Sequence, residues 1–413
     1  MCVFFYDFGL RSFLMPFALF LLGVAVFAQG TSEFMLSGLV PDIARDLHVS
    51  VPAAGALTSA FAAGMVVGAP LMAGLARRWS RRGALLGFLL AFMGVHVVGA
   101  LTDSFGVLLA TRVVGALANA GFLAVALVTA AAMVPADAKG RATSVLLGGV
   151  TLACVVGVPA GALLGHLWGW RSAFWAVTAL SLPAVVAVAR AVPAGTAESV
   201  RPAPALRAEL RALREPRLLT VLLLGALVNG ATFCTFTYLA PLVTNVTGLE
   251  ASRVPVVLAL FGLGAFAGVR VGGRFADRRP GTVVGAGGTV LCLGWCALAL
   301  GAEHPPLALG LVLVQGALSF AVGSTLISRA LHTAPTAPTL AGAFATAAFN
   351  IGAACGPWLG GTVIGSGGGY RSPVWAAAGL VAVALVVAGG AAYASARGNA
   401  GADRRRTPAS WSA

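Results

Sequence analysis

The stretch PFALFLLGVAVFAQGTSEFMLSGLVP, residues 16–41, decides the fold of this chain. A helix rises about 1.5 Å per residue and the hydrocarbon core of a bilayer is about 30 Å thick, so this apolar run can cross a membrane. Glu33 lies inside the run. A carboxylate at that depth costs at least ~2.5 kcal/mol on insertion scales, so such acids are rare and usually mark an ion or proton pathway. We therefore interpret Glu33 as functional. The alternative, an acid that reaches water from a helix end, is disfavoured by about 12 Å of helix before Pro41.

The rest of the chain is similarly apolar. Of its 413 residues, 59% are hydrophobic and 10% are charged, which excludes a soluble globular protein and predicts an all-α polytopic membrane protein. Every spanning segment must satisfy its backbone groups internally, so we expect helices. The sequence predicts twelve of them, at residues 17–40, 53–75, 84–102, 105–132, 143–165, 173–192, 218–240, 254–275, 281–301, 306–328, 340–364 and 373–394.

Most of the basic residues lie in the gaps between these segments, and mainly in alternate gaps. The formal charge is +14, yet 22 of the 27 Lys and Arg residues lie in gaps on one side and four on the other, with Arg112 inside a helix. The positive-inside rule then predicts that both termini are cytoplasmic and that the chain lies in the cytoplasmic membrane, surrounded by lipid. Because the charge reflects topology, we expect no nucleic-acid partner.

Two parts of the sequence repeat at an offset of 200 residues. GWRSAFW (169–175) recurs as GYRSPVW (369–375), and the same offset relates three other places. The charges of the stretch between the two parts alternate as on a solvated helix, or as on a basic face that lies on anionic lipid. The repeat predicts two six-helix halves related by a pseudo-two-fold axis, with the substrate site between them. The expected divisions are an extension at 1–16, a first half at 17–192, a linker at 193–216, a second half at 217–395 and a tail at 396–413.

Other classes of function find no support in the sequence. Six Cys lie mostly in apolar runs and five His are scattered without the spacing of metal ligands, so we expect neither a metal site nor a disulfide. No paired carboxylates, nucleophile elbow or phosphate loop indicates an enzyme. A membrane-bound sensor or scaffold is a distant alternative, because such proteins usually carry a soluble output domain.

Two loops carry the first resemblance to a known family. GLARRWSRRG (74–83) and its counterpart GRFADRR (273–279) resemble the G-x-L-A-D-R-x-G-R-R loop of the major facilitator superfamily. The resemblance implies a gate between helices, held by an Asp and nearby arginines. The first loop has an arginine in place of the acid, which puts a symmetric gate in doubt; alternatively, the arginines only set the topology. The residues concerned are Arg77, Arg78, Arg81, Arg82, Asp277 and Arg278.

Glycines and prolines of the fifth and eleventh predicted helices carry a second resemblance. Small residues four apart make a flat stripe that lets a neighbouring backbone approach closely, and a proline adds a bend. GGVTLACVVGVPAGALLG (148–165) and GAACGPWLGG (352–361) resemble the g-x-x-x-G-P-x-x-G-G motif of proton-coupled exporters in this family. Ordinary tight packing explains the glycines equally well. The motif residues are Gly157, Pro159, Gly161, Gly165, Gly356, Pro357 and Gly360.

Arg112 is the second charge inside a predicted helix. It lies in ATRVVGALANAG (110–121), which resembles the arginine motif of the family's fourth helix. Counting from the helix ends places Arg112 about 10 Å and Glu33 about 12 Å below the outer face. The first, fourth, seventh and tenth helices line the central cavity in this family, so the resemblance implies that both charges face it as a proton-coupling pair. In the alternative, Arg112 is a fixed partner that keeps Glu33 ionised and silent.

The second half has no counterpart of either charge, and its cavity helices offer uncharged polar groups instead. This asymmetry predicts that the first half handles the proton and that the second contributes hydrogen bonds and aromatic contact to a neutral solute. In the alternative, these side chains bond helix to helix, as polar residues commonly do in bundles. The candidate substrate-binding residues of the two halves are Gln29, Asn119, Asn229, Thr235, Tyr238 and Gln315.

A narrower resemblance covers nearly the whole chain. FAQGTSEFMLSGLVP (27–41), LANAGFLAVAL (117–127) and GWRSAFW look like the chloramphenicol exporters of actinobacteria, among the twelve-helix drug:proton antiporters. The resemblance implies export of chloramphenicol, a neutral nitroaromatic amide, in exchange for protons, with no cofactor beyond the coupling proton. Under alternating access, the drug binds while Glu33 is ionised on the cytoplasmic side and leaves when Glu33 is protonated on the outer side. We expect a monomer. Export of sugars or another amphipathic metabolite is the alternative.

Overall fold

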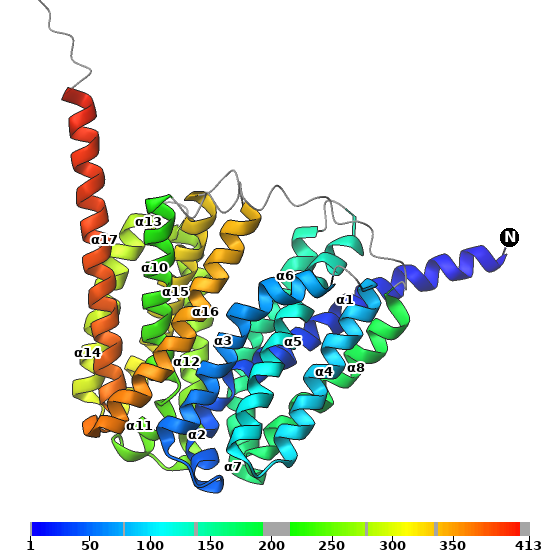
Figure 1. The fold of residues 1–413 in the computed structure, drawn as a ribbon, viewed down its shortest axis with the longest axis horizontal. Coiled ribbons are helices and arrows are strands. Elements are labelled where there is room, and N and C mark those ends of the chain that lie inside the picture. Colours follow the sequence, from blue (N-terminus) through cyan, green and yellow to red (C-terminus); the bar gives the residue numbers. More distant parts are fainter. Residues whose placement is uncertain are drawn as a thin grey trace, which may run out of the picture.

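The computed structural model describes residues 2–76, 79–135, 139–192, 215–276, 280–333 and 338–404, and the regular elements in these ranges are all helices. Figure 1 shows two bundles side by side, the first formed by α1 to α8 and the second by α10 to α17. Most of the predicted linker, residues 193–214, lies outside the described residues, as does the end of the predicted tail. The predicted domain limits therefore stay predictions.

The first half opens with a broken helix. α1 (Cys2–Phe34) ends one residue after Glu33, and α2 (Leu36–Asp46) continues beyond Met35. Serine side chains cap two later helices, because Ser80 and Ser104 accept hydrogen bonds from backbone N–H groups of the first turn. The other helices are α3 (Val51–Ala76), α4 (Arg81–Leu101), α5 (Phe105–Ala132), α6 (Lys139–Leu152), the π-helix η2 (Ala153–Gly157), α7 (Val158–Trp168) and α8 (Arg171–Ala191).

The second half repeats this order. Its elements are α10 (Pro216–Phe236), α11 (Leu239–Asn245), η4 (Ala251–Arg253), α12 (Val254–Ala276), α13 (Pro280–Thr282), η5 (Val283–Gly287), α14 (Gly288–Gly301), α15 (Pro305–Thr333), α16 (Pro338–Val363), η6 (Ile364–Gly368) and α17 (Ser372–Arg404). Among the described residues, eleven spans are long and apolar enough to cross a membrane, and α16 takes the place of the eleventh predicted segment. The predicted all-α polytopic fold is confirmed.

The 200-residue repeat extends to ion pairs that the sequence comparison did not identify. Arg171, at the start of α8, donates to Asp103 Oδ1 at 2.6 Å, and Arg371, just before α17, forms an ion pair with Glu303. Asp103 and Glu303 are themselves 200 residues apart. In each half, an equivalent ion pair therefore holds the last membrane helix to the loop that follows the third membrane helix. We call the end of the molecule that carries these pairs the outer end.

The two halves contact each other toward the outer end. A Cβ at Gly55 of α3 would lie 2.2 Å from the Tyr238 hydroxyl, and one at Gly38 of α2 would lie 2.8 Å from Leu258 of α12. An alanine at either position would therefore force a neighbouring side chain to shift, and glycine allows the close approach. In Figure 1, α2, α7 and α11 lie together at the bottom of the view. The first half thus meets the second through α2, α3 and α7, which contact α11, α16 and α12.

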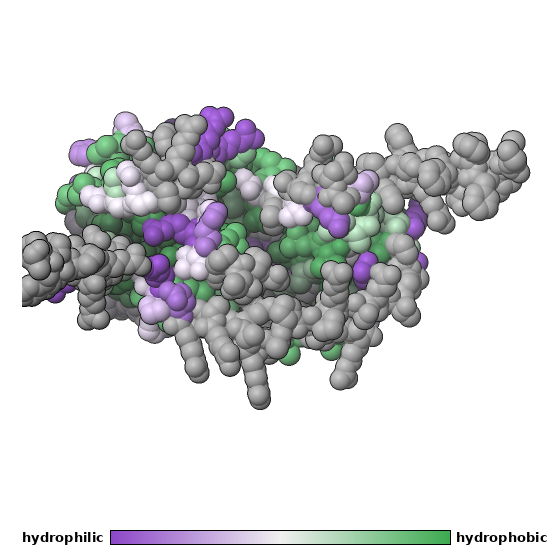
Figure 2. Space-filling model, turned by 90° about the horizontal axis from the view of Figure 1, so that it is seen from above, coloured by the Kyte–Doolittle hydropathy of each residue, from purple (hydrophilic) through white to green (hydrophobic). Residues whose placement is uncertain are grey.

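The opposite end carries the loops that the sequence predicts to be cytoplasmic, and we call it the inner end. Figure 2 looks down on it and shows hydrophilic residues gathered at this end of both halves, with hydrophobic residues around them. Large apolar side chains are exposed on the helices, including Val386 of α17, which is 75% exposed. Such exposure suits helices whose solvent is lipid.

Candidate functional site

Arg112 of α5 is the most deeply buried charge among the described residues, with only 1% of its surface exposed. Its Nη1 donates to Ser32 Oγ at 2.9 Å, and its Nη2 donates to the backbone oxygen of Ser32 at 2.8 Å. The guanidinium also lies over the ring of Phe61, 4.3 Å from its centre, which is a cation–π contact. Two helices therefore fix this cation: α1 through Ser32 and α3 through Phe61.

His96 of α4 extends the same network. Its Nδ1 lies 2.7 Å from the backbone oxygen of Phe92, and its Nε2 lies 2.6 Å from Ser32 Oγ. A carbonyl oxygen only accepts, so Nδ1 carries a proton, and in the neutral ring Nε2 then accepts the Ser32 hydroxyl proton. The Ser32 hydroxyl accordingly donates to His96 while it accepts from Arg112. The residues Arg112, Ser32 and His96, which we call the buried network, form one directed chain of hydrogen bonds.

Glu33 lies beside this network but is not part of its hydrogen bonds. Its side chain is half-buried, and it interacts electrostatically with Arg112 and with the Cys154 thiol of η2. Within the described residues, its carboxylate has neither a hydrogen bond nor a salt bridge. A Cβ at Gly262 of α12 would lie 2.4 Å from the Cys154 backbone oxygen. Glu33 therefore lies near the contact between the halves, with Arg112 near it but bonded elsewhere.

Three of the predicted substrate residues are buried, and two of these have polar groups without a hydrogen-bond partner among the described residues. Gln29 of α1 is 1% exposed, and neither atom of its amide has a partner among the described groups. The Thr235 hydroxyl of α10 is equally without one in the described part of the chain. Asn119 of α5 is buried as well. Because a buried unpaired polar group is unfavourable, the Gln29 amide and the Thr235 hydroxyl are available to a ligand or to water.

The other three predicted substrate residues bond helix to helix. Asn229 Nδ2 donates to the backbone oxygen of Phe349 at 2.7 Å, the Tyr238 hydroxyl donates to that of Pro357 at 2.8 Å, and Gln315 Nε2 donates to that of Leu291 at 3.1 Å. Such bonds are the alternative that the sequence left open. Asn229 joins α10 to α16, Tyr238 joins the residue just before α11 to α16, and Gln315 joins α15 to α14.

In each half, the glycines of the predicted antiporter motif pack against the first membrane helix of the same half. A Cβ at Gly157, Gly161 or Gly165 would meet Thr31, Met35 or Leu39, side chains that are also four residues apart. In the second half, a Cβ at Gly356 would lie 2.2 Å from the backbone oxygen of Gly230, and one at Gly360 would lie 2.7 Å from the Tyr238 ring. Both stripes therefore allow close helix packing, and the π-helix η2 ends just before Pro159.

The predicted gating loops are only partly described. Arg77, Arg78, Asp277 and Arg278 lie outside the described residues. Arg81 and Arg82 begin α4, where both are half-buried. Their role in a gate stays a prediction.

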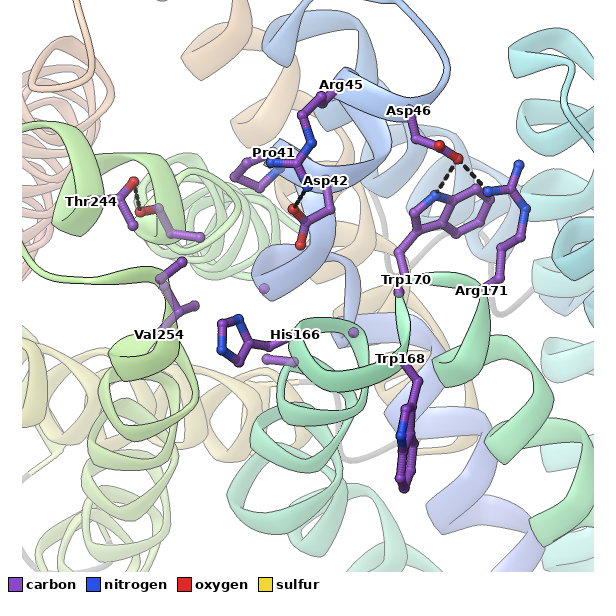
Figure 3. Close-up of a pocket in the computed structure, with 16 residues that line it drawn as sticks. Pro41, Asp42, Arg45, Asp46, His166, Trp168, Trp170, Arg171, Thr244 and Val254 are labelled. Atoms are coloured by element: carbon purple, nitrogen blue, oxygen red, sulfur yellow. Dashed lines mark hydrogen bonds and ion pairs between the residues drawn. The ribbon is translucent and has the colours of Figure 1, made fainter.

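A polar cavity of about 650 Å³ lies between the halves at the outer end. Figure 3 shows its wall, where Asp46 accepts hydrogen bonds from Trp170 and Arg171. The hydrogen bond from Trp170, followed by that from Arg171, lowers the pKa of Asp46 below its ordinary value. Gly38 also lines the cavity, and it packs against Ala162 and Leu258 too tightly for a methyl group.

Comparison with known families accounts for this architecture. The profile of the Major Facilitator Superfamily matches residues 22–346. The chain belongs to the major facilitator superfamily. This major facilitator protein is 60% identical over 375 residues to the "Chloramphenicol resistance protein" of Streptomyces lividans, a match that covers 91% of this chain and 96% of the relative. It is also 34% identical over 375 residues to a "Chloramphenicol efflux pump" of Mycobacterium tuberculosis, covering 88% and 89% of the two chains.

Solved structures of other major facilitator proteins share the fold. A bacterial homologue of the lysosomal transporter Spinster, described as inward-facing and occupied, superposes with a TM-score of 0.75 at 18% identity, covering 93% of this chain and 97% of that one. The nucleoside transporter NupG superposes with a TM-score of 0.76 at 12% identity, covering 91% and 98%. The predicted fold and family are therefore both confirmed.

Sequence reasoning missed two members of the buried network in this major facilitator protein, Ser32 and His96. A signal for His96 was present. It lies six residues before the end of the predicted third helix, about 9 Å below the outer face, at the depth already counted for Arg112 and Glu33. Ser32 carried no such signal, because serine is common in membrane helices.

Proposed function

We propose that this protein exports chloramphenicol, or a neutral amphipathic drug closely related to it, across the cytoplasmic membrane in exchange for protons. The observation that carries the proposal is the 60% identity to a chloramphenicol resistance protein along 91% of the chain. In this proposal the protein is a monomer with both termini in the cytoplasm, and it is not an enzyme. It needs no cofactor beyond the coupling proton.

The contact between the halves supports an inward-facing state of an alternating-access cycle. Gly38 and Gly55 pack against the second half with no space for a methyl group. We infer that this contact closes the outer end to the drug in this state. It would enter from the inner end and bind near the unpartnered amide of Gln29. Asn119 and Thr235 complete the polar groups that a neutral amide and two hydroxyls could use.

Glu33 is the proposed proton carrier because its carboxylate is not held by a partner. A carboxylate locked in a buried ion pair would not release or take up a proton readily, whereas Glu33 has the Arg112 charge nearby and its own hydrogen-bonding capacity unused. A change in the distance between the two groups during the cycle changes the affinity of Glu33 for protons. One proton moving down 100 mV supplies about 2.3 kcal/mol, or a concentration ratio of roughly forty-fold.

The test is an efflux panel in a susceptible bacterial host. Cells that express the protein should tolerate more chloramphenicol than cells with an empty vector, and an uncoupler should remove the difference. A panel that includes other amphipathic drugs and sugars identifies the substrate class. Resistance that survives the uncoupler would contradict proton coupling, and tolerance of another compound without tolerance of chloramphenicol would contradict the proposed substrate.

A further inference from the structure

A second cavity, of about 1020 Å³, lies at the inner end of the second half, away from Glu33 and from the contact between the halves. The inner ends of α10, α15 and α17 enclose it together with the start of the helix formed by α13, η5 and α14. We call it the inner crevice. Its floor is apolar, with Leu224, Val284 and Leu385 among the residues that line it, and its mouth carries Arg217, Arg329 and Glu215.

Comparison of the two halves explains why the crevice exists. Residues 281–289 of the second half read GTVVGAGGT, whereas residues 81–89 of the first half read RRGALLGFL. At the 200-residue offset, Gly285 and Thr289 of the crevice stand where the first half has Leu85 and Leu89. Both leucines are 0% exposed in the core of the first half. The second half has therefore replaced core side chains with small ones and left a space.

The same offset shows that the basic mouth belongs to the second half alone. Arg217 stands where the first half has Phe17, and Arg329 stands where it has Thr129. In the described part of the chain, neither arginine forms a salt bridge. With Glu215 the mouth carries two positive charges and one negative charge, above an apolar floor. This combination matches an amphipathic anion.

The position of the crevice favours a lipid as that anion. Its mouth lies at the inner ends of four membrane helices, which is the level of the phospholipid head groups. The positive-inside pattern assigns this end to the cytoplasmic leaflet, and basic pockets between helices on that side bind anionic head groups. We propose that the inner crevice binds an anionic phospholipid, with its phosphate between Arg217 and Arg329 and an acyl chain against Leu224, Val284 and Leu385.

Lipid retention measured by native mass spectrometry tests this proposal. The purified full chain is mixed with phosphatidylglycerol or with phosphatidylcholine, and the fraction that retains each lipid is compared. Arg217→Gln with Arg329→Gln removes the charge of the mouth, and Gly285→Leu fills the crevice with the side chain of the first half. A Cβ at Gly285 meets nothing within 4 Å, so Gly285→Leu can fold. The controls are Arg190→Gln, at the inner end of the first half, and Gly94→Leu, on an exposed face of α4 that is also open.

The wild type should retain phosphatidylglycerol in preference to phosphatidylcholine. The double arginine variant should reduce that preference by roughly thirty-fold, which corresponds to ~2 kcal/mol at tenfold per 1.4 kcal/mol, since each basic side chain contributes about 1 kcal/mol at an anionic surface. Gly285→Leu should lose the lipid, and both controls should keep it. Equal retention of the two lipids, or retention that survives Gly285→Leu, would overturn the proposal. Equal lipid retention by the wild type and all variants would also overturn the proposal, because it would mean that another segment of the chain occupies the crevice.

Discussion

Substituting Ser32 is the change that probes the buried network most selectively. Ser32→Ala removes the hydroxyl that accepts from Arg112 and donates to His96, but it keeps the backbone oxygen that Arg112 also binds. A hydrogen bond to a charged group contributes about 1.5–3 kcal/mol, and a buried acceptor left unpaired adds about 1–3 kcal/mol. The two effects together amount to about 2.5–6 kcal/mol. Because Arg112 retains its second bond and the Phe61 ring, we expect a loss near the lower end of that range, about 3 kcal/mol.

The variant should also change transport. Arg112 loses one of the two bonds that direct it to Ser32 and becomes free to approach Glu33. An ion pair between them would hold the carboxylate ionised, so drug efflux driven by protons should fall. Ser32→Thr keeps the hydroxyl and should retain both stability and efflux.

Thermal unfolding in detergent and drug accumulation in inverted vesicles measure the two effects. Ser37→Ala is the matched control, because the Ser37 hydroxyl on α2 is buried without a partner among the described residues, and its removal should change stability little. If Ser32→Ala and Ser37→Ala unfold at the same temperature and transport equally well, the buried network does not position Arg112 and the reasoning is refuted.

Three further predictions concern the packing and the outer end. Gly356→Ala would place a Cβ 2.2 Å from a backbone oxygen of α10, so it should lower the unfolding temperature clearly, and an unchanged temperature would mean that α16 shifts freely. Arg371→Gln breaks the exposed ion pair with Glu303 and should cost at most about 1 kcal/mol, with efflux kept; loss of efflux would instead show that the pair has a role in the cycle. Asp46→Asn should destabilise the protein by a constant amount from pH 8 to pH 5, because hydrogen bonds led by that from Trp170 lower the pKa of Asp46. This stabilisation is complete above the ordinary pKa of about 3.9 and disappears only as the pH falls through the lowered value, so a difference that vanishes between pH 8 and pH 5 would contradict the assignment.

Much of the fold could be predicted because its determinants are local. Apolar length sets each membrane span, and the 200-residue offset follows from repeated letters such as GWR and GYR. The ion pair of Arg371 with Glu303 was missed, although the same offset relates Glu303 to Asp103. The π-helices were missed as well, since one extra residue in a helical turn leaves no mark in an apolar sequence.

The site was harder to predict from the sequence, because the depth of a residue in the membrane does not tell in which direction its side chain points from the helix. Counting residues placed Glu33 and Arg112 at one level, but the rotation of α1 decides that Arg112 binds Ser32 instead of the neighbouring carboxylate. Rotation likewise decides that Tyr238 and Gln315 donate to backbone oxygens of other helices. These outcomes depend on how helices pack against each other, which hydrophobic pattern fixes only broadly.

The measurement that tests the central claim most directly is proton-driven chloramphenicol accumulation in inverted vesicles that contain Glu33→Gln, with drug binding measured on the same protein. We expect the variant to fold and to bind the drug, because the amide replaces a carboxylate that has no partner within the described residues. With no group left to carry the proton, it should not accumulate the drug above its equilibrium level when a proton gradient is imposed. Accumulation equal to that of the wild type would contradict the assignment of Glu33 as the proton carrier.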